Sequence, residues 1–423
     1  MNPMSDDAKA ILLLCGRLGR DCDAQPLEQT EYNRVVRWLL DNDMRPADLL
    51  HLDRVPTAAT GSGIPQQRLT FLLRRGVQLG FAIEAWNRSG VWVICRSDPD
   101  YPTRYKTHLK EKAPPVLFGV GERSLLQGGG LAIVGSRNAN AEAEDFTREV
   151  AEWCARGGVS VISGGARGID QAAMNAALAA GGRVIGVLAE KLLKNSVARE
   201  ARTAIADDRL LLISPYHPEA SFTVGTAMAR NRLIYALADY GLVVSADYRK
   251  GGTWAGAEEE LKRQPSRPVF VRLTGSVPAG NLKLLDLGAV EFPSFAGEDA
   301  PRAVLSQALD QPLRRPAERA EFPLFESAAP RRDEPARLRE APLVEENPPQ
   351  KSSPALRPAE PASIYESVLP VIVATLEEPA APEELAKRLH VSKSQLQAWL
   401  KQAVSEKTIR KLARPVRYAR REV

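Results

Sequence analysis

Four short stretches of the chain carry residue types that bind phosphate groups. Glycine lets main-chain N–H groups approach an anion closely, and arginine adds a planar, positively charged set of hydrogen-bond donors. The candidate ligands are Gly135, Ser136 and Arg137; Ser163, Gly164, Gly165 and Arg167; Arg230, Asn231 and Arg232; and Lys250, Gly251, Gly252 and Thr253. Taken singly, each stretch is also typical of a tight turn with a solvated arginine, so the flanking chain decides between the two interpretations.

The flanking chain alternates between apolar strands and helices. Strands are predicted at residues 131–134, 159–162, 183–188, 210–213, 241–245 and 268–273, and helices at 141–155, 171–180, 227–238 and 255–262. Parallel strands joined by helices predict an α/β fold with a Rossmann-like, doubly wound, mostly parallel sheet, whose ligands bind beyond the carboxyl ends of the strands. Because the four stretches follow or adjoin those ends, we expect them to converge into one extended phosphate-binding groove.

The same stretches contain no recognisable catalytic pair. The four histidines lie outside them, and no acid or nucleophile stands beside a base at a readable spacing. Asp170 begins a helix, where a cap or an arginine partner explains it better than catalysis, and Arg230 could pair with Asp239 or Asp247. Residues 163–170 also lack the G-x-G-x-x-G spacing of a dinucleotide site. We therefore predict a binding protein without catalysis, cofactor or metal.

Composition bounds the class of protein. The chain has 423 residues, 44% of them hydrophobic and 26% charged, and a formal net charge of +5. The basic balance is compatible with a polyanionic partner but does not prove one. The four cysteines have no C-x-x-C spacing, so neither a zinc site nor a disulfide framework is supported. No apolar run approaches about 18 residues and no signal peptide is visible, which predicts a cytoplasmic protein without membrane contact.

Composition and hydrophobic pattern along the chain predict four parts. Residues 1–88 form a helical N-terminal domain and residues 89–297 form the α/β core. Residues 298–362 are rich in proline and poor in large apolar side chains, which predicts a disordered linker. Residues 363–423 predict a winged-helix domain. From the residues alone, that domain could contact DNA or dock a protein.

The order of the motifs resembles the DNA-processing protein A family (DprA, also called Smf). The resemblance covers roughly residues 90 to 295 and includes Asp100-Tyr101-Pro102 and residues 115–119. It implies a Rossmann-like core that binds single-stranded DNA, forms a homodimer and helps to load the RecA recombinase in natural transformation. In that family the groove would be lined by Ser136, Arg137, Ser163, Gly164, Gly165, Arg167, Arg230 and Arg232.

Three departures from the family pattern leave alternatives open. The family usually has leucine where this chain has Gly165, and an aromatic–proline pair where this chain has Met228-Ala229. It also has a glycine-rich segment where this chain has Ala189-Glu190-Lys191. A paralogue acting in DNA mobility or phage defence is one alternative, and a nucleotide-binding sensor with the same fold is another.

An enzyme is the remaining alternative. Lysine-decarboxylase-like phosphoribohydrolases carry a Pro-Gly-Gly-x-Gly-Thr-x-x-Glu pattern. Placing its first glycine on Gly251 brings Glu258 into register, but Trp254 and Ala255 then stand where glycine and threonine belong. The pattern therefore disfavours an enzyme of this class.

Overall fold

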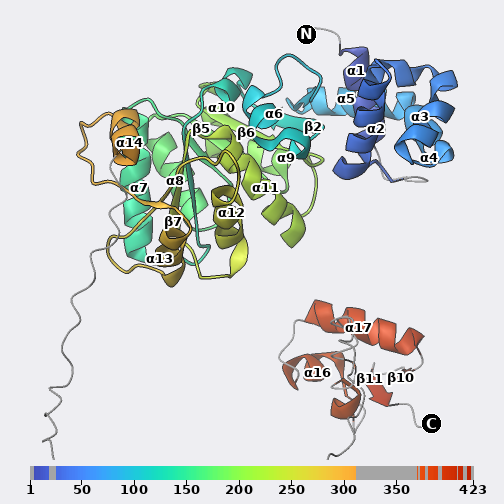
Figure 1. Cartoon of the computed structure of the whole chain (residues 1–423). Coiled ribbons are helices and arrows are strands. Elements are labelled where there is room, and N and C mark those ends of the chain that lie inside the picture. The colour runs from blue at the N-terminus through green and yellow to red at the C-terminus, as the bar shows by residue number, and fades with distance from the viewer. Residues whose placement is uncertain are drawn as a thin grey trace, which may run out of the picture. The chain divides into compact units, whose positions relative to one another are not determined.

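The chain forms two compact units, Met1–Phe322 and Pro323–Val423. The structure is a computed structural model, and it describes residues 4–18, 25–310, 369, 372–376, 380–388, 393–406, 408–412 and 417–420. Figure 1 shows both units.

Helices make up the beginning of the first unit. They are α1 (Asp6–Cys15), α2 (Gln29–Asp41), α3 (Val55–Ser62), α4 (Gln66–Leu73) and α5 (Gly76–Arg88), with the short turns η1 (Pro46–Leu50) and η2 (Leu52–Arg54). The Ser5 hydroxyl accepts a hydrogen bond from the Ala8 N–H and caps α1. Leu12, Val35 and Leu72 are fully buried between the helices. The helical character predicted for residues 1–88 is confirmed, although this segment and the α/β core belong to one compact unit.

A nine-stranded sheet forms the centre of the first unit. Its spatial order is β1-β2-β6-β5-β4-β3-β7-β8-β9. The strands are β1 (Trp92–Cys95), β2 (Val116–Val120), β3 (Leu131–Gly135), β4 (Val161–Ser163), β5 (Val184–Val187), β6 (Leu210–Ser214), β7 (Tyr240–Ser245), β8 (Val269–Val271) and β9 (Val290–Glu291). The pairs from β6 through β9 are parallel, whereas β1 and β2 join antiparallel at one edge. The predicted doubly wound, mostly parallel sheet is confirmed.

Helices cover both faces of this sheet. They are α6 (Thr103–Leu109), α7 (Ala141–Arg156), α8 (Ile169–Ala179), α9 (Leu192–Ser196), α10 (Arg199–Ala206), α11 (Val224–Leu237), α12 (Gly251–Leu261), α13 (Ala279–Asp286) and α14 (Pro301–Asp310), with the short turns η3 (Lys110–Lys112) and η4 (Arg123–Gln127). Because side chains alternate along a strand, Ile133 packs in one apolar cluster with α7 and α8, while Ala132 packs in a second cluster with α11 and α12. Strands buried on both faces explain the continuous apolar runs of the sequence.

The predicted start of the linker at residue 298 is wrong, because α14 follows it. Leu305 is fully buried, Pro301 is also buried, and the indole N–H of Trp153 in α7 donates to the carbonyl of Asp299 at 2.8 Å. Figure 1 shows α14 beside α7. Pro301, Leu305 and Leu309 recur at helical spacing, a signal that the proline-rich composition obscured. Residues 311–362 lie outside the described residues, so the rest of the linker stays a prediction.

Among its described residues, the second unit contains a short helical stretch at residues 372–375, two named helices and a hairpin. The named elements are α16 (Pro382–Arg388), α17 (Lys393–Ser405) and the antiparallel strands β10 (Ile409–Leu412) and β11 (Arg417–Arg420). Leu385, Leu396, Leu400, Ile409 and Tyr418 share its apolar core. The order of these elements is the predicted one, and the winged-helix assignment itself stays a prediction. Within the described residues, every helix is too short or too polar to cross a membrane.

Asn281 holds the turn that leaves β7, and its removal tests this description of the core. Its fully buried carboxamide accepts from the Ala246 N–H at 2.9 Å and donates to the carbonyls of Val244 and Arg272 at 3.0 and 2.9 Å. Asn281→Ala leaves buried main-chain groups unpaired, so we expect a loss of about 3 kcal/mol in unfolding free energy. Urea unfolding followed by circular dichroism measures it. The exposed Asn195→Ala is the control and should change stability by less than about 0.5 kcal/mol. Equal effects of the two substitutions would contradict the assignment.

Candidate nucleic-acid interface

Three of the four candidate stretches follow adjacent parallel strands. β3 lies between β4 and β7, where the strand order reverses, and Gly135 at its end is paired with Ser245 of β7. Such a reversal opens a crevice beyond the carboxyl ends of the strands. The turns after β3, β4 and β7 therefore meet at one edge of the sheet, as the sequence predicted.

The fourth stretch, residues 230–232, lies on α11. α11 begins at Val224 after β6, packs against α12, and contacts β5, β4 and β3 on its way to β7. The Asn231 amide donates to the carbonyl of Gly252 at 2.8 Å, and the Thr253 hydroxyl donates to the carbonyl of Gly135 at 3.0 Å. These two predicted ligands use their side chains to join the turns to one another.

The fourteen predicted residues differ greatly in exposure. Arg137, Gly165, Arg167, Lys250 and Gly251 are exposed; Gly135, Ser136, Asn231, Arg232, Gly252 and Thr253 are half-buried; and Ser163, Gly164 and Arg230 are buried. The Ser163 hydroxyl donates to the carbonyl of Ile133 at 2.6 Å and joins β4 to β3. The expectation that the Ser163 side chain lines the groove is therefore wrong, because it points into the sheet.

Arg230 is likewise not a surface ligand. Only 4% of the residue is exposed, and Nη1 lies 3.7 Å from Oδ2 of the buried Asp170. A Cβ at Gly164 would lie 1.3 Å from that Nη1 atom, so glycine is required for the guanidinium to sit beneath the turn. The prediction that Asp170 has an arginine partner is confirmed, whereas the alternative partners Asp239 and Asp247 are wrong. Asp239 instead pairs with Arg104 and Arg302.

Burial opposes the charges of this pair. It raises the pKa of Asp170, against the effects of Arg230 and of main-chain hydrogen bonds at Ala166, Gly135 and Gly164. Burial also lowers the pKa of Arg230, against the effect of Asp170. Within the described residues, Nε and Nη1 of Arg230 have no hydrogen-bond partner. The pair thus depends on mutual neutralisation and on the surrounding main-chain dipoles.

The exposed cations surround the turn that this pair supports. The guanidinium of Arg137 lies 5.1 Å from the centroid of the Phe222 ring, and Nη2 of Arg167 donates to Oδ1 of Asn138 at 2.5 Å. Lys250 stands exposed at the start of α12. Gly165 adopts a φ of +66°, a left-handed conformation that favours glycine and leaves its main chain exposed. The edge therefore combines positive charge with open main chain, the donor set that suits phosphates.

Comparison with known proteins identifies the family of this chain. The family model described as DNA recombination-mediator protein A matches residues 92–293. The chain is 31% identical over 215 residues to the DNA processing protein DprA of Bacillus subtilis, covering 49% of this chain and 70% of that protein. The chain belongs to the DprA family.

One solved DprA structure agrees with the fold. DprA of Streptococcus pneumoniae has a TM-score of 0.56 and 22% identity, and the match covers 72% of this chain and 98% of that one. A DprA from Helicobacter pylori, whose structure was described for its single-stranded DNA binding mode, has a TM-score of 0.42 and 27% identity over 52% of this chain and 98% of that one. The likeness to the Streptococcus pneumoniae protein shows that the two chains share a fold.

Glu258, the glutamate of the enzyme alternative, has a structural explanation in this DprA chain. It lies two turns into α12, where it accepts hydrogen bonds from the Trp254 indole at 3.1 Å and the Lys262 ammonium at 2.8 Å. The hydrogen bond from Lys262 lowers the pKa of Glu258. Because the Glu258 carboxylate is hydrogen-bonded to Trp254 and Lys262, its presence gives the enzyme alternative no support.

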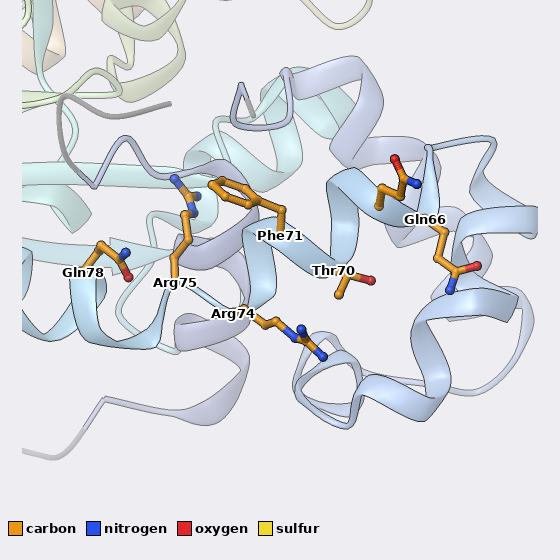
Figure 2. Close-up of a pocket in the computed structure, with 7 residues that line it drawn as sticks. Gln66, Thr70, Phe71, Arg74, Arg75 and Gln78 are labelled. Atoms are coloured by element: carbon orange, nitrogen blue, oxygen red, sulfur yellow. The ribbon is translucent and has the colours of Figure 1, made fainter. Parts of the chain in front are cut away.

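A pocket of about 500 Å³ lies on the N-terminal helices and contains none of the candidate ligands. Its lining side chains come from α4, from α5 and from the turn between them, and Figure 2 labels all of them except Gln67: Gln66, Gln67, Thr70, Phe71, Arg74, Arg75 and Gln78. Arg75 is buried and donates to the carbonyls of Leu13 and Gly16, so it supplies hydrogen-bond partners at the C-terminal end of α1. The pocket therefore belongs to the packing of the helical segment rather than to the strand ends.

Sequence reasoning missed two exposed aromatic residues at the strand ends. Phe222 precedes α11 and Tyr248 precedes α12, and each lies beside an arginine. For Tyr248 the available signal was the adjacent Arg249 in a predicted loop, whereas Phe222 has no cation beside it in the sequence and meets Arg137 only in the fold.

The ion pair of Arg230 and Asp170 makes a specific prediction for stability. Arg230→Met leaves a buried carboxylate without its partner, so we expect a loss of about 3 kcal/mol in unfolding free energy. Adding Asp170→Asn removes that charge and should restore part of the loss, which makes the second substitution stabilising in this background. Urea unfolding of the single and double variants measures the coupling, with the exposed Arg167→Met as control. A further loss in the double variant would refute the coupling.

Proposed function

We propose that this DprA family member binds single-stranded DNA through its phosphates, without turnover. The observation that carries the proposal is the set of exposed cations, Arg137, Arg167 and Lys250, grouped around glycine turns at one sheet edge. A guanidinium binds phosphate oxygens through paired N–H donors, and open main-chain N–H groups add neutral donors. Because the cations come from three successive turns, they suit a chain of phosphates better than one nucleotide.

Three further properties stay predictions. A homodimer should have twice the chain mass of 46.2 kDa in light scattering at micromolar concentration, and a monomer there would remove this expectation. The hand-over of the strand to a RecA-type recombinase, and the winged-helix character of the second unit, are likewise proposed on the resemblance and on the predicted element order.

Fluorescence anisotropy with a labelled oligothymidylate of about 30 nucleotides tests the DNA proposal. We expect the wild-type affinity to fall steeply with salt, because phosphate contacts release counterions. Arg137→Ala with Arg167→Ala should weaken binding at least tenfold and lower the slope of log affinity against log salt by ~1.4, the value for two lost contacts to a single strand.

The matched control is Arg156→Ala, which removes an exposed arginine at the opposite end of α7 that pairs with Glu152. It should leave both the affinity and the slope unchanged. Absence of binding by the wild type, or an equal effect of the control, would refute the proposed interface.

A further inference from the structure

Two aromatic rings stand exposed beside arginines at the same sheet edge. Phe222 and Tyr248 are each 40% exposed. The Arg137 guanidinium lies 5.1 Å from the centroid of Phe222, and the Arg249 guanidinium lies 5.0 Å from the centroid of Tyr248. Each ring therefore has a positive charge close enough to contact a ligand that lies on the ring.

Phe222 is carried to the edge by the loop between β6 and α11. β6 lies three strands from β3 in the sheet, yet the ring contacts Arg137, which follows β3. The next residue, Thr223, caps α11: its hydroxyl accepts from the Thr226 N–H at 3.0 Å, which fixes the main chain beside the ring. Val224 and Met228, one helical turn apart, are 67% and 45% exposed and extend the apolar surface.

Tyr248 lies on the other side of β3 and packs against Trp254. It follows the end of β7 by three residues, and its ring meets the buried Trp254 ring edge-on, with centroids 5.0 Å apart and planes at 88°. The pairing of Gly135 with Ser245 places this turn next to the one that carries Arg137. The two rings thus stand on loops that each adjoin the turn carrying Arg137.

We propose that Phe222 and Tyr248 are stacking platforms for unpaired bases of the strand whose phosphates the neighbouring arginines bind. The inference rests on the proposed function and adds what that function leaves open, namely how single strands are preferred over duplexes. Every unpaired base offers a π-face to an aromatic ring, whereas a duplex buries those faces between its base pairs. Arginine beside the ring supplies the charge for the adjoining phosphate.

The test separates base contacts from phosphate contacts by using three labelled probes. They are an oligothymidylate of about 30 nucleotides, an abasic oligonucleotide with the same number of phosphates, and a hairpin duplex. Wild-type protein should bind the oligothymidylate about tenfold more tightly than the other two probes. Phe222→Ala with Tyr248→Ala should remove this preference, and should leave abasic affinity and its salt slope within about twofold of wild type.

Two further variants control for general effects. Phe222→Tyr with Tyr248→Phe keeps both rings and should keep the preference. Phe81→Ala removes a ring that is 69% exposed on α5 and should change nothing. Ultraviolet cross-linking of a 5-iododeoxyuridine strand to wild-type protein should attach at peptides containing Phe222 or Tyr248, a readout that does not depend on the folding of any variant.

The outcomes distinguish this inference from the function on which it rests. Equal wild-type affinity for the thymidylate and abasic probes would overturn the platforms while leaving phosphate binding intact. No binding to either probe would overturn both proposals. Loss of abasic affinity in the alanine variant would show that the rings only support the arginines. A changed oligomeric state with unchanged DNA binding would assign the surface to self-association instead, and would also overturn the inference.

Discussion

A buried ion pair between Arg230 and Asp170 is the interaction on which the candidate interface depends. Asp170 lies in the first turn of α8, on one face of the sheet, and Arg230 lies in α11, on the other face. Their charges meet at the strand ends directly beneath Gly164, where a side chain would collide with the guanidinium. Because each charge is costly to bury alone, the pair fixes both helices relative to the turn between them. The exposed groups at this edge are positioned by the turn that the ion pair supports.

The predicted ligands divide accordingly into residues that build the edge and residues that face solvent from it. Ser163, Asn231 and Thr253 donate their side-chain hydrogen bonds to main-chain carbonyls of neighbouring elements. Arg137, Arg167 and Lys250 are exposed. A main chain held by these hydrogen bonds, with exposed charges around it, suits a polyanion, whose phosphates vary in position from one bound strand to the next. A catalytic site would instead need charged groups held close to one reacting atom.

Much of the fold could be predicted from sequence, because apolar runs and their helical connections are local signals. The convergence of the turns also followed, since the carboxyl ends of parallel strands share one edge. Side-chain direction did not follow from motif membership. Arg230 and Arg232 stand two positions apart on a helix and so point to different sides. α11 also begins at Val224, three residues before the predicted start at residue 227. The pairing of Arg230 with Asp170 spans 60 positions of sequence, and no local pattern encodes it.

The two kinds of exposed group should respond differently to the surroundings of the protein. Exposed cations act through charges that salt screens within about 8 Å at physiological ionic strength, so their share of the affinity falls as salt rises. The buried pair beneath them is screened far less, and the geometry of the edge should therefore persist in salt that weakens phosphate contacts. Stacking on Phe222 and Tyr248 depends on contact area rather than on net charge. An edge with both contributions can retain a single strand where one made only of arginines would release it, and the rings then contribute to the share of the affinity that survives in high salt.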